Sequence, residues 1–176
     1  CGRSRSGKST FAHAVQRMLS ETGRRVLRLE LDRWILPLEH RRPDMNAEER
    51  SRVELYPEIV SMLRRSGQVK APGYDAASRG RLRGTTAYDA RDAEVILMDG
   101  IFAGHASIRE QVDMSVFVEA SQQSLLNRFH TFYAWKGLTP VAAEALWQSR
   151  IQEEWPRIDL QRKSADIVIN LEEAIL

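Results

Sequence analysis

The first residues of the chain have the types and spacing needed to hold the phosphates of a nucleotide. From Gly2 to Ser9 they fit the pattern G-x-x-x-x-G-K-[ST] at every fixed position. The glycines of this pattern let the main chain bend so that its N–H groups face a triphosphate, while Lys8 would reach the β- and γ-phosphates and Ser9 would ligate Mg²⁺. The less specific alternative is a glycine-rich helix start with a surface lysine. The pattern predicts ATP and Mg²⁺ as cofactors, with contacts from Gly2, Ser4, Ser6, Gly7, Lys8, Ser9 and Thr10.

An acid that could help to hold the metal ion follows a second segment. Residues 95–98 form a continuous apolar run that Asp99 ends, which is typical of a buried parallel strand. Ligands of open α/β sheets bind at the carboxyl ends of the strands, and an acid there can reach Mg²⁺ directly or through water. Asp99 could instead cap the turn that follows the strand.

The elements that must position these groups alternate between helices and strands. Apolar spacing predicts helices over residues 10–22, 47–66, 121–135 and 140–155, with Pro57 kinking the second or starting a new segment. Strands are expected over residues 26–31, 68–71, 95–98, 114–118 and 167–169, and a long functional loop over residues 73–92. This order predicts an α/β fold of the P-loop NTPase type, a doubly wound parallel sheet in a three-layer α/β/α arrangement.

The composition is that of an ordinary domain. The chain has 176 residues, of which 43% are hydrophobic and 28% are charged, so we expect one domain over residues 1–176. A strand should precede a phosphate loop of this kind, and we therefore expect a domain that lacks its first strand at the N-terminus. A net charge of +2 suits an anionic ligand but does not by itself indicate nucleic acid.

Cysteine usage and hydropathy bear on location and partners. Cys1 is the one cysteine, which excludes a disulfide framework and favours a reducing, cytoplasmic setting. Apolar runs of membrane-spanning length are not found in the sequence. We expect a small-molecule acceptor as partner, with no nucleic acid and no membrane; a homo-oligomer stays an open option.

Several collinear stretches resemble the uridine kinase and phosphoribulokinase-like family of P-loop kinases. The phosphate loop is the first. The others are the strand ending in an acid and an aromatic at residues 29–34, the Pro-Gly-Tyr-Asp segment at 72–75 with Arg81 downstream, and the apolar strand with its acid-Gly-Ile end at 95–102. The tail at 163–169 is also similar to the closing strand of the family. The likeness covers almost the whole chain in the same order.

The resemblance implies an ATP-dependent kinase that transfers the γ-phosphate to an acceptor hydroxyl. Asp32 corresponds to the catalytic acid, which takes the proton from the hydroxyl and lies near Mg²⁺ together with Ser9 and Asp99. A strand-end carboxylate could do this chemistry, although Asp32 could also be a surface acid. Arg128 stands where the family carries a lid arginine, so the implied catalytic residues are Asp32, Lys8 and Arg128.

The implied acceptor site also departs from the family. Tyr74 and Asp75 would hold the acceptor with Arg81 and Asp99, but Arg79 stands where uridine kinases usually have a histidine. The lid stretch at 127–138 has fewer cations than the family pattern. An arginine facing the acceptor suits an anionic sugar or a sugar acid more than a nucleoside. The packing of Tyr74 in a half-buried wall is an equal alternative.

Because the lid stretch has few cations, a second function is also compatible with the sequence. The chain could be a non-catalytic nucleotide-binding or regulatory domain of a larger protein. A kinase would need a moving lid that excludes water, and we expect it over residues 121–140 with Gly137 as a hinge. A GTPase is disfavoured because no N-K-x-D segment is present.

Overall fold

The computed structural model describes residues 1–75 and 80–172, so the predicted substrate residue Arg79 and the side chain of Arg81 lie outside the described part. The α-helices are α1 (Lys8–Glu21), α2 (Ala47–Ser51), α3 (Tyr56–Ser66), α4 (Ala106–Arg109), α5 (Gln122–Trp135), α6 (Pro140–Glu153) and α7 (Trp155–Ser164). The strands are β1 (Val26–Glu30), β2 (Gln68–Asp75), β3 (Gly80–Asp89), β4 (Val95–Asp99), β5 (Val116–Glu119) and β6 (Ile167–Asn170). Short 3₁₀ turns are η1 (Leu31–Trp34), η2 (Leu38–His40) and η3 (Val53–Leu55).

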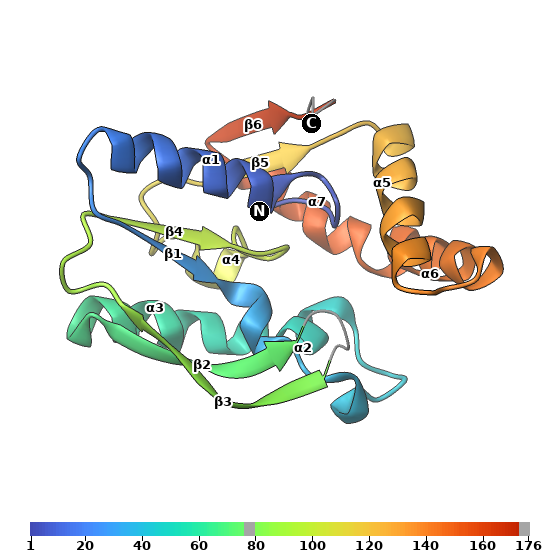
Figure 1. Ribbon diagram of the computed structural model, residues 1–176, viewed down its shortest axis with the longest axis horizontal. Coiled ribbons are helices and arrows are strands. Elements are labelled where there is room, and N and C mark those ends of the chain that lie inside the picture. Colours follow the sequence, from blue (N-terminus) through green and yellow to red (C-terminus); the bar gives the residue numbers. More distant parts are fainter. Residues whose placement is uncertain (76–79, 173–176) are drawn as a thin grey trace.

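Parallel strand pairs form the centre of the fold. β1 pairs in parallel with β4, with Glu30 opposite Asp99 at the last position, and β5 pairs in parallel with β6. β2 and β3 form a separate antiparallel pair. Helix α1 lies on one side of the β1–β4 pair and α3 on the other (Figure 1). The predicted α/β fold with parallel strands is confirmed.

The start of the chain lies alongside β5. The nitrogen of Cys1 donates to the carbonyl of Val116 at 2.9 Å, and the N–H of Val118 donates to the carbonyl of Cys1 at 2.9 Å. This is the pairing that one residue of a parallel strand makes with its neighbour. It brings the phosphate loop to the carboxyl end of β5, because Gly2 follows directly.

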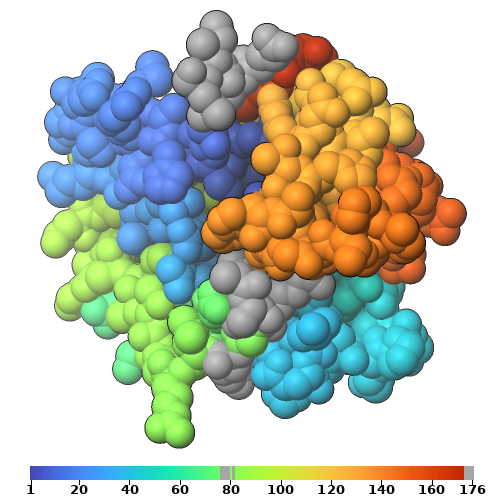
Figure 2. All heavy atoms as spheres, turned by 45° about the vertical axis from the view of Figure 1, so that its right-hand side comes forward, coloured from blue at the N-terminus to red at the C-terminus, as the bar shows by residue number. Residues whose placement is uncertain are grey.

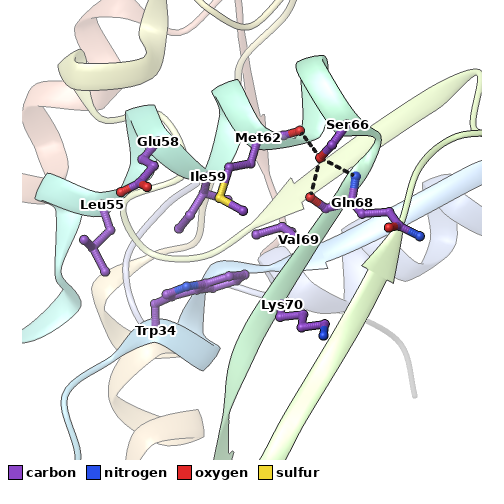
Figure 3. A pocket seen from close by; sticks show the side chains of 9 residues that line it. All are labelled: Trp34, Leu55, Glu58, Ile59, Met62, Ser66, Gln68, Val69 and Lys70. Carbon is purple, nitrogen blue, oxygen red and sulfur yellow. Dashed lines mark hydrogen bonds between the residues drawn. The ribbon is translucent and has the colours of Figure 1, made fainter.

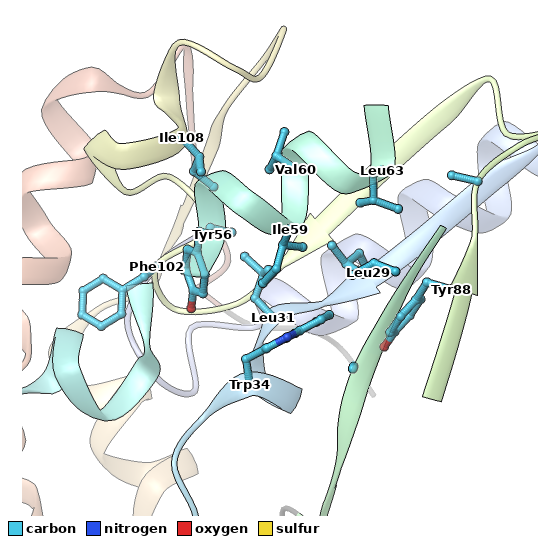
Figure 4. Close-up of a cluster of buried hydrophobic side chains, with 14 of the residues drawn as sticks. Leu29, Leu31, Trp34, Tyr56, Ile59, Val60, Leu63, Tyr88, Phe102 and Ile108 are labelled. Carbon is cyan, nitrogen blue, oxygen red and sulfur yellow. The ribbon is translucent and has the colours of Figure 1, made fainter. Parts of the chain in front are cut away.

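The main hydrophobic core lies under α3 (Figure 4). Four residues of α3 are buried, at the spacing of one helical face: Tyr56, Ile59, Val60 and Leu63. They pack with fully buried residues of other elements, among them Leu29, Leu31, Phe102, Ile108, Phe117 and Ile158. This core also contains Leu29 of β1 and Leu31 directly after it, so it fixes the carboxyl end of β1.

A second core joins α5 to α6. Phe129 is fully buried, with its ring 4.4 Å from that of Tyr133 and 5.1 Å from that of Trp147. Leu125 and Ala143 complete the contact between the two helices. Because this cluster is separate from the core under α3, α5 and α6 form a packed unit of their own.

The segment predicted as a long loop at residues 73–92 is largely a β-hairpin. β2 runs through Pro72 and Gly73 with a register irregularity between Pro72 and Tyr74, and β3 occupies most of the remainder. A Cβ atom on Gly73 would come within 2.7 Å of the carbonyl oxygen of Leu82, so the two strands approach closely at this point. The prediction was wrong because most of β3 is exposed, which leaves no alternation of apolar and polar residues.

Several element boundaries also differ from the prediction. The helix expected at 47–66 is interrupted at Arg52, which has a φ of 56°, and α3 begins with Pro57 in its first turn. β4 is parallel as predicted, but its apolar side chains are only partly buried and Ile96 is 40% exposed. Helices α4 and α7 were not predicted. In the described ranges no helix has the length and apolar character needed to cross a membrane.

Candidate active site

The phosphate loop has the backbone shape that an anion cradle needs. Gly2 and Gly7 have φ values of 141° and 95°, which favour glycine. A Cβ atom on Gly2 would come within 2.2 Å of the carbonyl oxygen of Val118, so this close approach requires glycine. Phe11 donates the first helical hydrogen bond, to the carbonyl of Gly7 at 2.9 Å. The N–H groups of the preceding turn therefore point out of the helix start, as they do in anion sites.

The other predicted cradle residues differ in their exposure. Ser6 is completely buried, and in the described structure its hydroxyl has no hydrogen-bond partner. Ser4 is half-buried, whereas Ser9 and Thr10 are exposed in the first turn of α1. The hydroxyl of Ser9 is accordingly open to an incoming ion, and the loop as a whole fits a polyphosphate.

Lys8 lies within electrostatic reach of both predicted acids. Burial lowers the pKa of its ammonium group, while the carboxylates of Asp32 and Asp99 act in the opposite direction. A lysine at the start of α1 is thus brought to two strand ends that are far away in sequence. These three groups form the centre of the candidate site.

Asp32 lies in the η1 turn that continues β1. Gly100 is its neighbour, because a Cβ atom on Gly100 would stand 3.4 Å from the Oδ1 atom of Asp32. Asp32 is an exposed residue by its surface area, yet desolvation of its carboxyl group by the atoms around it raises its pKa. Lys8 and the backbone N–H of Ile101 lower that pKa, and the charge of Asp99 adds to the rise. A carboxyl group with a raised pKa is a better proton acceptor than an ordinary aspartate.

Asp99 is paired with an arginine that the sequence did not single out. Its side chain is 7% exposed, and its Oδ2 atom accepts a hydrogen bond from Arg28 at 3.0 Å. Arg28 also contacts Glu30, which in turn pairs with Arg33 at 2.9 Å. One oxygen of the predicted metal ligand is therefore held by Arg28. The signal in the sequence was weak, because Arg28 alternates with the apolar Leu27 and Leu29 and shares its face of β1 with the polar Glu30.

Arg128 binds main-chain carbonyls around the phosphate loop. Its guanidinium donates to the carbonyls of Arg5 at 3.3 Å, Leu171 at 3.0 Å and Glu172 at 3.2 Å. It also lies near Gly7, since a Cβ atom there would be 3.9 Å from its Nη1 atom. The predicted lid arginine thus lies at the loop, where it ties α5 to the segment after β6.

The predicted acceptor residues lie on the hairpin. Tyr74 and Asp75 are half-buried at the end of β2, opposite Arg81 and Gly80 of β3. The β2 strand packs against η1, which carries Asp32. The hairpin can therefore form one wall of a space that ends at Asp32.

Sequence reasoning missed the role of two arginines inside the phosphate loop. Arg3 makes a bidentate pair with Asp159 at 2.8 and 2.6 Å, and its guanidinium stacks 4.0 Å from the ring of Trp155. Arg5 stacks 3.2 Å from the ring of Phe132. Figure 2 shows the orange surface of α5 and α6 beside the blue N-terminal residues. Both arginines occupy variable positions of the motif, which carry no signal by themselves.

A hollow of about 430 Å³ lies away from these groups, beside α3 (Figure 3). Its walls are mainly apolar and include Trp34, Ile59, Met62 and Val69. Trp34 belongs to the same η1 turn as Asp32 and stacks on Tyr88, with ring centroids 6.3 Å apart. The aromatic end of the predicted acid-aromatic segment is therefore a packing residue, and the phosphate chemistry lies elsewhere.

The residues present fit a magnesium ion only together with a nucleotide. Within residues 1–75 and 80–172, His, Cys, Asp and Glu do not gather in groups of three or more that could hold a metal. Mg²⁺ is commonly bound by one or two carboxylates, a hydroxyl, water and substrate phosphates. The exposed hydroxyl of Ser9 and the carboxylates of Asp32 and Asp99 are suitable protein groups for such a site.

Two solved structures with a similar fold carry the word kinase in their descriptions. A "Possible Uridine Kinase" from Bacillus stearothermophilus has 22% sequence identity and a TM-score of 0.61, over 96% of this chain and 84% of the other. A "putative fructose transport system kinase" from Silicibacter sp. TM1040 has 21% identity and a TM-score of 0.72, over 96% of this chain and 86% of the other. No match was found among curated proteins.

Structural similarity at 21–22% sequence identity shows the fold alone, so the family is assigned from a family model. The model of the phosphoribulokinase / uridine kinase family matches residues 1–173. The matched range includes the phosphate loop, both acids and the α5–α6 unit. The chain is thus a P-loop kinase and belongs to the phosphoribulokinase / uridine kinase family.

Proposed function

We propose that this protein transfers the γ-phosphate of ATP to a hydroxyl group of a small anionic acceptor, with Asp32 as the base. The observation that carries the proposal is the meeting of Lys8 and Asp32 at the end of β1. A module that only binds nucleotides has no need of an acid beside the lysine at that point.

Each residue of the site has a separate role in the proposed reaction. The amides of the loop and Lys8 hold and neutralise the phosphates, and bound Mg²⁺ would add further neutralisation of charge. Asp32 accepts the proton of the acceptor hydroxyl, for which its raised pKa is suited. Asp99, with one oxygen on Arg28, contributes its remaining oxygen to the metal side of the site. Most of the rate comes from this positioning and charge neutralisation.

The acceptor is expected to enter along the hairpin. Tyr74 and Asp75 stand on β2, which packs against the turn carrying Asp32. Arg79 and Arg81, which follow Asp75 in the sequence, would supply positive charge for an anionic sugar or sugar acid. One solved structure with this fold is described as a sugar transport system kinase, which agrees with a sugar-like acceptor.

The lid is proposed to be the α5–α6 unit. Its core of Phe129, Tyr133 and Trp147 is separate from the main core, and Gly137 between the helices has a φ of 79°. A unit with its own core can move as one body, so we extend the expected lid from residues 121–140 to include α6. Closure would exclude water and suppress hydrolysis of ATP.

Substitution of Asp32 by asparagine tests the proposal. We expect kcat to fall by at least about a hundredfold while the affinity for ATP stays nearly constant, because the base is removed and the cradle is kept. The matched control is Asp44→Asn, which changes an exposed aspartate in a surface pair with Arg42. Unchanged turnover in the Asp32 variant would exclude this residue as the base.

The acceptor can be identified with the same assay. A panel of nucleosides, sugars, sugar acids and phosphorylated sugars is scored by ADP release with Mg²⁺. We expect anionic sugars to exceed nucleosides in kcat/KM. Binding of ATP with no transfer to any member would favour a regulatory nucleotide-binding domain instead.

A further inference from the structure

Two guanidinium groups beside the phosphate loop are short of hydrogen-bond partners. An arginine side chain has five N–H donors. In the described structure Arg150 of α6 makes one side-chain hydrogen bond, to the hydroxyl of Tyr133 at 2.8 Å, and its Nε atom is buried without a partner. Among residues 1–75 and 80–172 no hydrogen bond from the guanidinium of Arg5 is found, and its Nε atom is buried without a partner as well. By contrast, Arg3 forms a bidentate ion pair with Asp159.

A continuous set of contacts joins these two cations. Arg5 stacks on Phe132, Phe132 packs 5.2 Å from Tyr133, and Tyr133 holds Arg150. Arg150 has one carboxylate nearby, Glu154 at 3.5 Å, and Arg50 shares that carboxylate at 3.8 Å. The positive charge of this cluster is therefore only partly balanced by the protein.

The cluster acts on the lysine of the phosphate loop. Arg5 and Arg150 both repel Lys8 and lower its pKa, in addition to the effect of burial. Arg150 and Arg50 share the carboxylate of Glu154, so in the described residues this partly buried positive charge is incompletely compensated and favours an anionic ligand. Arg128 is less available for this task, because it already donates to three main-chain carbonyls.

We propose that Arg150, positioned by Tyr133 and assisted by Arg5, is a contact of the terminal phosphate of the bound nucleoside triphosphate. This inference rests on the proposed function and adds to it a residue from α6, outside the stretch expected to carry the lid arginine. Closure of the α5–α6 unit would bring a fixed positive charge to the group that is transferred. The contact is lost when α6 moves away, so closure and phosphate binding are coupled.

The test compares the affinities for ATP and ADP, measured by calorimetry with Mg²⁺ and without acceptor. Arg150→Gln should weaken ATP binding by about ten- to a hundredfold and ADP binding by less than about threefold, because one hydrogen-bonded charge contact is lost. Tyr133→Phe keeps the ring packing and should weaken ATP selectively by a smaller factor. Arg150→Lys should restore part of the preference for ATP.

A matched control variant is available on the neighbouring helix α7, and several outcomes would refute the proposed role of Arg150. Arg157→Gln removes an arginine of the neighbouring helix that pairs with Glu48 at 3.1 Å, and the ratio of the two affinities should not change. If Arg150→Gln weakens ATP and ADP equally, or neither, the proposal is refuted, while ATP binding that depends on Lys8 would leave the proposed function intact. A rise only in the KM of an anionic acceptor would also refute it. If the parent protein binds no ATP, both proposals fail.

Discussion

The contribution of the buried Arg28–Asp99 ion pair to the stability of the protein can be predicted from its burial and its neighbours. Arg28 is 13% exposed and Asp99 is 7% exposed, with 3.0 Å between the charged atoms. Removal of one partner from such a pair costs about 3–5 kcal/mol, because the other charge stays buried alone. Glu30 would keep its pair with Arg33 at 2.9 Å. We therefore expect Arg28→Met to lower the free energy of unfolding by about 3 kcal/mol, the lower end of that range.

Thermal and denaturant unfolding measure this loss. For a chain of this size about 1 kcal/mol corresponds to roughly 2–4 °C, so the melting temperature should fall by about 6–12 °C. Methionine retains an unbranched apolar stem, so the change in packing is small. The matched control is Arg24→Met, which removes an arginine that pairs with Glu94 at 3.1 Å but is 60% exposed. Solvent and salt screen the control pair, and its melting temperature should change less than a third as much.

The double variant separates the charge from the packing. Arg28→Met combined with Asp99→Leu removes both charges, and it should recover most of the stability lost in the single variant. The reasoning would be refuted if Arg28→Met were no more destabilising than Arg24→Met. It would also be refuted if the loss of unfolding free energy in the double variant equalled the sum of the losses in the two single variants.

The remaining predictions concern the acid, the loop and the second core. The rate should fall as the pH decreases through the raised pKa of Asp32, because transfer needs its ionised form. The acidic limb of kcat/KM should lie above the ordinary range of an aspartate and disappear in Asp32→Asn, and a limb that persists would assign it to another group. Gly2→Ala should destabilise the protein by about 1–3 kcal/mol, and Gly23→Ala, which also has positive φ but open space around it, should cost less. Phe129→Ala should cost about 3–5 kcal/mol in thermal unfolding, whereas Trp135→Ala, at a ring that is 74% exposed, should change stability by less than about 0.5 kcal/mol.

Local chemistry made several features predictable from the sequence. The phosphate loop could be found because glycine, lysine and serine are needed there at fixed spacing, and Gly2 and Gly7 do adopt backbone conformations that favour glycine. The helix predicted at 121–135 was recognisable because Ser121 caps it and its apolar residues recur with helical period. These signals lie within one element, so one chain segment is sufficient to read them.

The strand β3 and its pairing with β2 were not predicted, because the signals for this hairpin do not lie within one element. Residues 68–71 of β2 were predicted as a strand, and Val69 and Ala71 are buried there, whereas most of β3 is exposed and leaves no alternation of apolar and polar residues in the sequence. The close approach of Gly73 to the strand opposite can be seen only when both strands are in place.

The sequence alone determined the cradle, the α/β class and the two acids at strand ends, since each depends on residue type and short-range spacing. Tertiary structure decided what those groups face. It paired Asp99 with Arg28, placed Lys8 near Asp32, turned Arg128 toward main-chain carbonyls and joined Arg150 to Tyr133. These contacts join residues that are far apart in the chain, and electrostatic interaction depends on distance and burial in space. No periodicity along the sequence contains that information.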